Sequence, residues 1–404
     1  MDRRKMLLMS LLGTTALLSP SARAQAVKPL KIGVINDMTS VYADYQGIGS
    51  VIATNMAIAD HAERLGIRVE VVSADHQNKP DIGSSIARSW YDIDGVDVIM
   101  DAPNSAVALA VIGITKDKNK VFIGSGAGSS VITGAQCTPN TVHWTYDTWS
   151  LGHSLGKALV AEGGKTWFFI TADYAFGKDL EKSASDAVEA AGGKVLGVAR
   201  HPLNTADFSS YLLQAQASGA DVVAFANAGG DTNNSIKQAA EFGLGAKQRL
   251  AGLILNVTNI PGLGMAAVQN VKIVTGFYWD RTDDSRAFAK RFSALHPRKA
   301  QPNDMHAGMY AATLHLMKAY AQVKSAADGK ALVDAMKAMP TDDPLFGKGS
   351  IRVDGRKLHP MYLLATKTVA ESKSDWDSFN VVRTIAVEDA WRPLAEGGCA
   401  FAKG

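Results

Sequence analysis

The pattern that organises this chain begins at residues 31–47 with KIGVINDMTSVYADYQG and starts again at residues 165–177 with KTWFFITADYAFG. The first copy continues with GIRVEVVSADHQN at residues 66–78, and the second continues with GGKVLGVARHPLN at residues 192–204. The two copies share few identical residues, but the order and the spacing of their elements agree. A repeat of this kind predicts two lobes of similar structure.

Both copies alternate short, β-branched apolar runs with segments whose apolar residues recur at helical spacing. Strands that alternate with helices predict parallel sheets with right-handed crossovers. We therefore expect the α/β class, with two Rossmann-like lobes. The expected strands lie at residues 32–35, 68–73, 96–100 and 121–124 in the first copy and at residues 167–171, 195–199, 222–226 and 250–255 in the second.

The pattern changes beyond residue 273. We expect the later helices to return to the first lobe and the last strands to join the second, so that several chain crossings form a hinge. The later helices are expected at residues 285–295, 305–323 and 330–339, and the strands at 349–353 and 361–366. The first lobe would comprise residues 28–147 and about 279–345, and the second would comprise residues 148–278 and about 346–404.

The N-terminus has the pattern of an export signal. Three basic residues, Arg3, Arg4 and Lys5, precede an apolar run that is too short to span a bilayer. The sequence Ala-Arg-Ala at residues 22–24 then fits the small-x-small cleavage rule. We expect residues 1–24 to be a signal peptide that is cleaved near Ala24 and directs the protein to the periplasm. The adjacent arginines leave both the general and the twin-arginine export routes open.

Length and charge narrow the classes of function. The chain has 404 residues, enough for two domains that each bury a core. Its formal net charge of +3 resides in the predicted signal peptide, so the remainder is close to neutral. A neutral body gives no electrostatic reason to expect binding to nucleic acid or to an anionic membrane.

The chain contains two cysteines, Cys137 and Cys399. Export makes a disulfide possible, because the compartment outside the cytoplasm is oxidising. We expect the two cysteines to pair and to tie the C-terminal tail to the end of the first lobe. The alternative is two separate thiols.

A glycine-rich turn, FIGSGAGS at residues 122–129, follows a predicted strand and opens a helix. It is one residue short of a dinucleotide fingerprint and follows the fourth strand of its lobe, so we expect no nucleotide cofactor. Its backbone N–H groups would suit a carboxylate, although a plain tight turn is the alternative. Neither a paired histidine motif nor a nucleophile elbow is present, so we expect no metal and no enzymatic activity.

Polar and aromatic residues gather after the strands, at the carboxyl ends where open parallel sheets bind ligands. Loops rich in Tyr, Ser, Asn and Gly suit a pocket with aromatic walls and a few fixed polar groups. Asn104 and Asp231 could equally be helix caps or turn formers. The candidate ligand-binding residues are Tyr42, Asn104, Ser105, Ser125, Gly126, Ala127, Gly128, Ser129, Tyr174, Asp231, Tyr278 and Trp279.

At these positions the chain resembles the type I periplasmic binding proteins of the leucine/isoleucine/valine-binding branch. The resemblance covers nearly the whole chain after the predicted signal peptide. It implies the fold of that family, in which a hinge joins two lobes and the solute lies between them. The segments that carry it are IGVINDMTSVYADYQG (32–47), VFIGSGAGSSVIT (121–133), TADYAFGKDL (171–180), DFSSYLLQAQASGADVV (207–223) and NAGGDTNNSIKQAAEFGL (227–244).

The resemblance also implies roles for single residues. The carboxylate of the solute would be held in the first lobe by Ser105, Gly126 and either Gly128 or Ser129. The amino group of an amino-acid ligand would be held by Asp231 of the second lobe.

Aromatic residues would wall the pocket for the rest of the solute. By resemblance these are Tyr42, Tyr174 and Tyr278. Trp279 and the segment HWTYD at residues 143–147 add aromatic bulk near the hinge. This bulk leaves two ligand classes open, an aliphatic amino acid and an aromatic or 2-oxo acid.

The function that the resemblance implies is that of an extracytoplasmic solute-binding subunit of an ABC importer. Such a protein binds a small organic carboxylate, closes around it as a monomer, and docks transiently on a permease. An alternative is a periplasmic sensor that passes the closed form to a membrane signalling partner.

Overall fold

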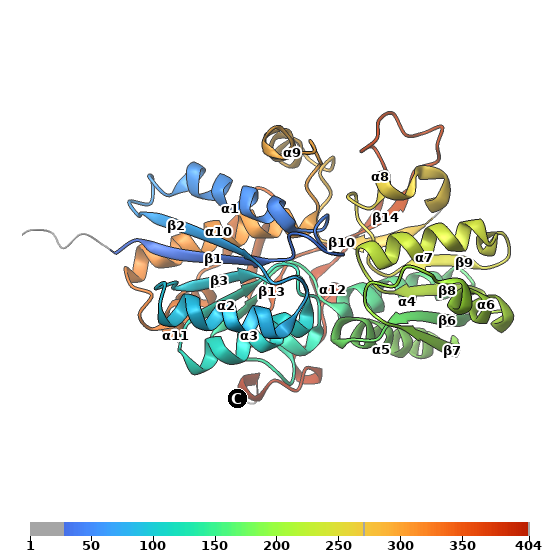
Figure 1. Cartoon of the computed structure of the whole chain (residues 1–404), viewed down its shortest axis with the longest axis horizontal. Coiled ribbons are helices and arrows are strands. Elements are labelled where there is room, and N and C mark those ends of the chain that lie inside the picture. The colour runs from blue at the N-terminus through green and yellow to red at the C-terminus, as the bar shows by residue number, and fades with distance from the viewer. Residues whose placement is uncertain (1–27, 270, 403–404) are drawn as a thin grey trace, which may run out of the picture.

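The structure is a computed structural model that describes residues 28–269 and 271–402 (Figure 1). The predicted signal peptide lies outside the described residues. No helix in the described ranges is long and apolar enough to cross a membrane. The two sequence repeats form two α/β lobes that lie side by side along the longest axis of the molecule (Figure 1).

The first lobe is built on a five-stranded parallel sheet with the order β2-β1-β3-β4-β5. Its central strands are apolar and buried along nearly their whole length, because helices cover both faces of the sheet. The elements are β1 (Leu30–Asn36), α1 (Gly47–His61), β2 (Val69–Asp75), α2 (Pro80–Asp92), β3 (Val98–Asp101), α3 (Ser105–Asp117), β4 (Val121–Gly124) and β5 (Thr141–His143).

The second lobe repeats this arrangement with the sheet order β7-β6-β8-β9, again parallel. The last strand was expected to reach residue 255 but ends at Gly252, where its ladder with β8 stops and the chain turns toward the cleft. The elements are α4 (Thr148–Ala161), β6 (Thr166–Ala172), α5 (Ala175–Ala190), β7 (Lys194–His201), α6 (Ser209–Ser218), β8 (Val222–Ala226), α7 (Gly230–Glu241), β9 (Arg249–Gly252) and α8 (Ile260–Leu263).

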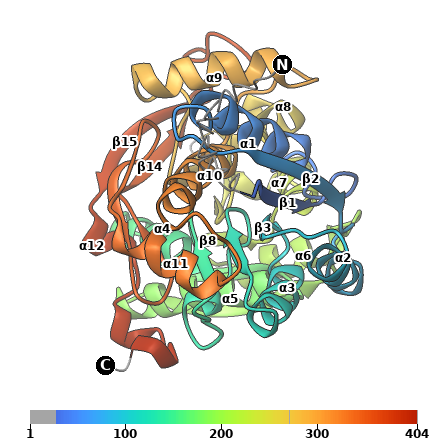
Figure 2. The same ribbon diagram turned by 90° about the vertical axis from the view of Figure 1, so that its left-hand side faces the viewer.

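The later part of the chain crosses between the lobes several times. The helices α9 (Asp283–Leu295), α10 (Asp304–Val323) and α11 (Gly329–Ala338) share one apolar cluster with β1 and β3 of the first lobe. Viewed from the end of the first lobe, α1 and α10 lie on one side of its sheet, and α2 and α3 lie on the other (Figure 2).

Three antiparallel strands extend the second lobe. These are β10 (Lys272–Thr275), β14 (Met361–Thr366) and β15 (Phe379–Ile385), and β14 contributes to both apolar clusters of that lobe. A small sheet of β11 (Thr341–Asp343), β12 (Gly347–Ile351) and β13 (Lys357–Leu358) lies between β10 and β14 in the chain. Phe346 and Ile351 lie in the apolar cluster of the first lobe, at and beyond the boundary between the lobes that was expected near residue 346. The position of that boundary stays a prediction.

The C-terminal segment returns to the first lobe. After the short helix α12 (Val387–Ala390), the chain runs to Cys399, whose sulfur is bonded to that of Cys137. The bond links residues 262 positions apart in the sequence and joins the tail to the loop between β4 and β5. Arg392 adds a contact in the same place, because its guanidinium donates to Ser130 O at 2.9 Å.

Candidate functional site

The two lobes meet around a cavity whose walls are mainly aromatic. The space between its wall atoms is about 230 Å³, which includes space open to solvent. The lining residues come from loops at the carboxyl ends of strands in both parallel sheets, together with the first turn of α10, which is where the strand order predicts a ligand site. They are Tyr42, Tyr45, Pro103, Gly126, Tyr146, Tyr174, Phe176, Ala228, Ile254 and Met305.

Hydrogen bonds across the cleft hold the lobes in a closed arrangement. The phenol of Tyr42 in the first lobe bonds to the phenol of Tyr174 in the second. Beside this pair, Gly230 N–H donates to Val41 O at 3.0 Å. Burial raises the pKa of both Tyr42 and Tyr174 well above its usual value, so both hydroxyls stay neutral and can donate or accept.

The hydroxyl groups expected to hold a solute carboxylate are engaged elsewhere. Ser105 Oγ accepts a bond from Ser129 N–H at 3.1 Å, and Ser129 Oγ donates to Asp179 at 2.9 Å. Gly128 lies behind the aromatic wall, where an added Cβ would come within 2.6 Å of the Phe176 ring. Of the expected carboxylate-binding residues, Gly126 lines the cavity, and Ser105, Gly128 and Ser129 do not.

Three other candidates have structural partners. Asn104 caps α3, because its side-chain oxygen accepts from Ala106 N–H at 2.8 Å. Ser125 Oγ donates to Met305 O at 2.7 Å, and Ala127 O lies 2.5 Å from the His143 ring nitrogen. These three residues therefore hold the loops around the cavity in shape, but they do not line the cavity.

Asp231 holds a loop of the second lobe. Its carboxylate accepts from Asn204 N–H at 3.0 Å and from Thr205 N–H at 2.8 Å. Burial raises its pKa to about 6. Burial is also the main cause of the raised pKa of Tyr42 and Tyr174, and the charge of Asp231 raises the pKa of both further. Its role toward an amino group stays a prediction.

Tyr278 and Trp279 lie apart from the aromatic cavity. Tyr278 lines a second cavity of about 220 Å³ near the hinge, together with Asn256, Thr275 and Asp304. Trp279 Nε1 donates to Trp376 O at 3.1 Å, within the cluster that covers β14. Neither residue is among those that line the aromatic cavity.

Several lining residues had no clear signal in the sequence. Ile254 and Met305 are single apolar residues without a motif, and only the closed arrangement brings them together. Asp101, which is fully buried at the end of β3, was also not among the expected site residues. Asp179, near the start of α5, was likewise not among the expected site residues.

Asp179 forms a latch between the lobes. It lies on α5 of the second lobe and accepts from Ser130 N–H at 2.6 Å, from Ser130 Oγ at 3.0 Å and from Ser129 Oγ at 2.9 Å. The hydroxyl of Thr148 bonds to the same carboxylate. Ser129 and Ser130 follow β4 of the first lobe, so their bonds to Asp179 join the two lobes.

Replacing Asp179 by alanine should weaken solute binding roughly tenfold or more. The variant loses the acceptor for several closed-state bonds, so a smaller fraction of the protein occupies the closed form and the apparent affinity falls in proportion. Isothermal titration calorimetry would measure the affinity. The matched control is Asp186→Ala on the same helix, because Asp186 is exposed and, among the described residues, its carboxylate pairs only with Lys182. Equal affinities in both variants would contradict the latch.

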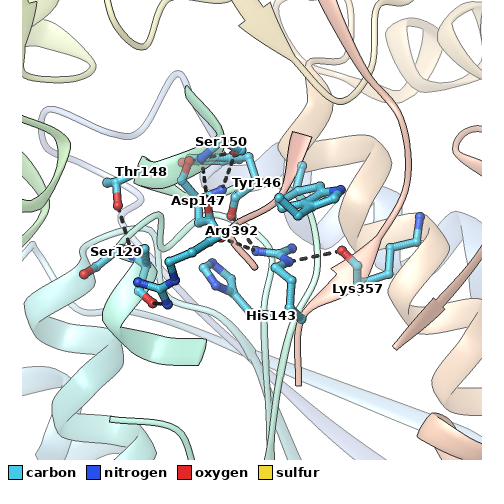
Figure 3. A network of polar contacts seen from close by, with 12 residues as sticks. Ser129, His143, Tyr146, Asp147, Thr148, Ser150, Lys357 and Arg392 are labelled. Atoms are coloured by element: carbon cyan, nitrogen blue, oxygen red, sulfur yellow. Dashed lines mark hydrogen bonds and ion pairs between the residues drawn. The ribbon is translucent and has the colours of Figure 1, made fainter. Parts of the chain in front are cut away.

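A buried polar network fixes the hinge beside the cavity (Figure 3). Arg356 is fully buried, and its guanidinium donates to Tyr146 O at 2.9 Å and to Lys357 O at 3.1 Å. Its charge is balanced by Asp147, 3.7 Å away, which also caps α4. Because Tyr146 forms part of the cavity wall, this network connects the hinge strands to the site.

The described residues hold no group of three or more His, Cys, Asp or Glu side chains placed to bind a metal ion. The cavity lining likewise contains no Lys or Arg side chain. The site is therefore an apolar, aromatic enclosure whose polar atoms are phenols, backbone groups and the buried acids behind its walls.

Comparisons with known proteins agree on one family. A family model described as periplasmic binding protein matches residues 29–373. The chain is 45% identical to a periplasmic binding protein of Burkholderia mallei, whose crystal structure superposes with a TM-score of 0.89 over 92% of this chain and 99% of that one.

Two further crystal structures are similar. One is a branched chain amino acid ABC transporter periplasmic ligand-binding protein from Burkholderia xenovorans LB400, 40% identical, with a TM-score of 0.82 over 93% of this chain and 100% of that one. The other is an ABC transporter solute binding protein of R. palustris in complex with benzoate, 21% identical, with a TM-score of 0.80 over 92% and 100% of the two chains.

Proposed function

Because this chain belongs to the type I periplasmic binding proteins of the leucine/isoleucine/valine-binding family, we propose that it is the solute-binding subunit of an ABC importer. The solute would occupy the aromatic cavity between the lobes. The observation that carries this proposal is the set of bonds across the cleft, from Tyr42 to Tyr174 and from Asp179 to Ser130, which closes the lobes around that cavity.

The mechanism that follows is hinge closure. A solute that contacts the loops of one lobe recruits the other lobe, and the bonds across the cleft then stabilise the closed form. The closed form presents both lobes to the permease in a fixed orientation. Binding makes and breaks no covalent bond, in keeping with a family whose members bind solutes.

The solute that the cavity suits is a small organic carboxylate with an aromatic or branched aliphatic body. Aromatic walls pack well against either kind of body, because they bury apolar surface without demanding specific partners. The B. xenovorans relative is named for branched-chain amino acids and the R. palustris relative holds benzoate, so both classes occur among proteins of this fold.

A thermal-shift panel on refolded, solute-free protein tests this proposal. Leucine, valine and phenylalanine would be compared with benzoate and phenylpyruvate, and sucrose would serve as a solute without a carboxylate. A solute at about 100 times its dissociation constant adds about 2.7 kcal/mol to the stability of the folded state, which raises Tm by several degrees. A shift with sucrose and none with any carboxylate would contradict the proposed solute class.

A further inference from the structure

Lys357 places an amine inside the hinge without a hydrogen-bond partner. Its side chain has no exposed surface, and among the described residues no atom accepts a hydrogen bond from its Nζ. The carboxylate that pairs with it is that of Asp343, whose Oδ2 lies 4.0 Å from Nζ and also lacks a hydrogen-bond partner. A lysine is rarely buried so completely, because its charged form loses its hydration. The hinge therefore contains an amine that is costly to protonate.

Aromatic rings surround the amine where hydrogen-bond acceptors would be expected. Its Nζ lies 4.2 Å from the centre of the Phe346 ring and 5.2 Å from the centre of the Trp144 ring. The faces of these rings attract a cation, but they replace only part of the hydration that the ammonium has lost. Burial lowers the pKa of Lys357 to about 7, although the charge of Asp343 acts in the opposite direction.

Three segments in which the chain crosses between the lobes meet beside this amine. They run through residues 143–147, 275–279 and 356–360. His359 Nε2 lies 2.9 Å from Thr145 O, which joins the third crossing to the first. A Cβ added at Gly276 would come within 2.8 Å of the His359 ring and 3.3 Å of Thr145 O, so the second crossing packs tightly against the other two.

Lys357 is in contact with this junction through its rings. Trp144 belongs to the first crossing, and Lys357 itself belongs to the third. Phe346 connects the amine to the second crossing, because its ring centre lies 6.4 Å from that of Phe277. The amine points away from the polar network of Arg356, so the two basic groups do not share partners (Figure 3). Hinge motion is taken up by backbone rotation in such crossings, and it therefore shifts the rings relative to the amine.

We propose that Lys357 makes the closure of the two lobes depend on pH. In the closed arrangement the amine is packed among rings, and opening of the hinge admits water to it. The neutral amine therefore favours the closed arrangement, and the ammonium favours the open one. This inference rests on the proposed function only through hinge closure, and it does not depend on which solute the protein binds.

The direction of the pH dependence follows from the two pKa values of the amine. A hydrated lysine has a pKa of about 10.4, whereas the pKa of Lys357 in the closed arrangement is about 7. Below pH 7 both arrangements carry the ammonium, so the cost of burying it is fully present and constant. As pH rises from 7 to about 10.4, the closed arrangement releases its proton first, and closure becomes more favourable.

Other charged and titratable groups face the amine from neighbouring elements. Burial lowers the pKa of His315 and of His359, so both rings stay neutral above pH 7. Burial lowers the pKa of Arg356 to about 10, so its guanidinium stays mainly charged up to pH 9. Asp343 faces the amine from β11. Lys357 is thus the basic group of this cluster that changes its charge between pH 7 and pH 9.

Small-angle X-ray scattering of solute-free protein at pH 7 and pH 9 tests the proposal through the radius of gyration. In the parent protein the ratio of closed to open molecules should rise by up to about 50-fold over this interval, so the radius should fall. Lys357→Met keeps the length of the side chain without its charge, and it should be the more compact protein at pH 7. The difference from the parent should shrink at pH 9.

A surface lysine of the first lobe provides the matched control. Lys330 is exposed on α11 and pairs with Asp334, so Lys330→Met should keep the radius of the parent at both pH values. Asp101, whose pKa burial raises to about 8, titrates over the same interval in all three proteins. The comparison therefore uses the difference between each variant and the parent, in which the effect of Asp101 cancels.

Thermal unfolding separates a role in closure from a role in the fold alone. If Lys357→Met raised Tm at pH 7 but had the radius of the parent at both pH values, the buried amine would affect only the stability of its lobe, and the proposal would be overturned. A radius of the parent that stays constant from pH 7 to pH 9 would overturn it as well. Either result would leave the importer function standing, because neither measurement involves a solute.

Discussion

Asp147→Ala should lower the free energy of unfolding by about 3–5 kcal/mol, because it leaves the charge of Arg356 buried without a counter-ion. Arg356 is fully buried, and its guanidinium also lies 4.5 Å from the centre of the Trp391 ring, so it cannot turn toward water. Asp147 further accepts from Ser150 N–H at 2.7 Å as the cap of α4, and that bond is lost as well. Urea unfolding followed by tryptophan fluorescence would measure the change.

A double variant tests whether the loss of stability comes from the unpaired buried charge of Arg356 or from the loss of other contacts of Asp147. Asp147→Ala combined with Arg356→Met should recover much of the lost stability, because an apolar side chain of similar length needs no counter-ion. The exposed pair of Asp283 with Arg286 provides a surface control, and Asp283→Ala should leave the unfolding midpoint unchanged within error. If the double variant were no more stable than Asp147→Ala, charge burial would not be the cause of the loss.

Replacing both Cys137 and Cys399 by alanine should lower the free energy of unfolding by about 3–5 kcal/mol. The bond closes a loop of 262 residues, and in the chain-entropy account long loops restrict the unfolded chain most. Guanidinium unfolding of the oxidised protein, the reduced protein and the double variant would measure this effect. The reduced protein should match the double variant.

Solute affinity provides the internal control for the disulfide. Neither cysteine lines the aromatic cavity, so the double variant should bind its solute as tightly as the parent protein at a temperature where both are folded. An unchanged unfolding midpoint would show that the tail contributes little to the stability of the lobes. A large loss of affinity would instead connect the tail to closure, through the contact of Arg392 with Ser130.

Much of the fold was predictable because the relevant signals are local. The strands β4 and β8 were expected at the residues where the structure has them, since each is a short apolar run bounded by turn formers. The strand β15 was missed because it lies at the edge of its sheet and exposes Val381 and Val382, so its pattern lacks a buried face. The helix α4 was missed because it buries most of its surface and shows little contrast between faces.

The candidate site was predictable in place but not in detail. The rule that ligands bind at the carboxyl ends of parallel strands led to Tyr42, Gly126 and Tyr174, and all three line the cavity. The same rule also selected Ser129 and Trp279, which the structure places outside it. The position of a residue after a strand determines the loop in which it lies. It does not determine the direction in which the side chain points.

The sequence by itself determined the two-lobe α/β architecture, because apolar periodicity and glycine positions act over a few residues and recur in both copies. Only the tertiary structure decided which hydrogen-bonding groups remain free for a solute. The hydroxyl of Ser129 meets Asp179, fifty positions away, and Gly126 lies against the side chain of Gln46, eighty positions away. These pairings depend on how the loops pack and how the lobes close, and on the cost of leaving a buried polar group without a partner, which no local pattern records.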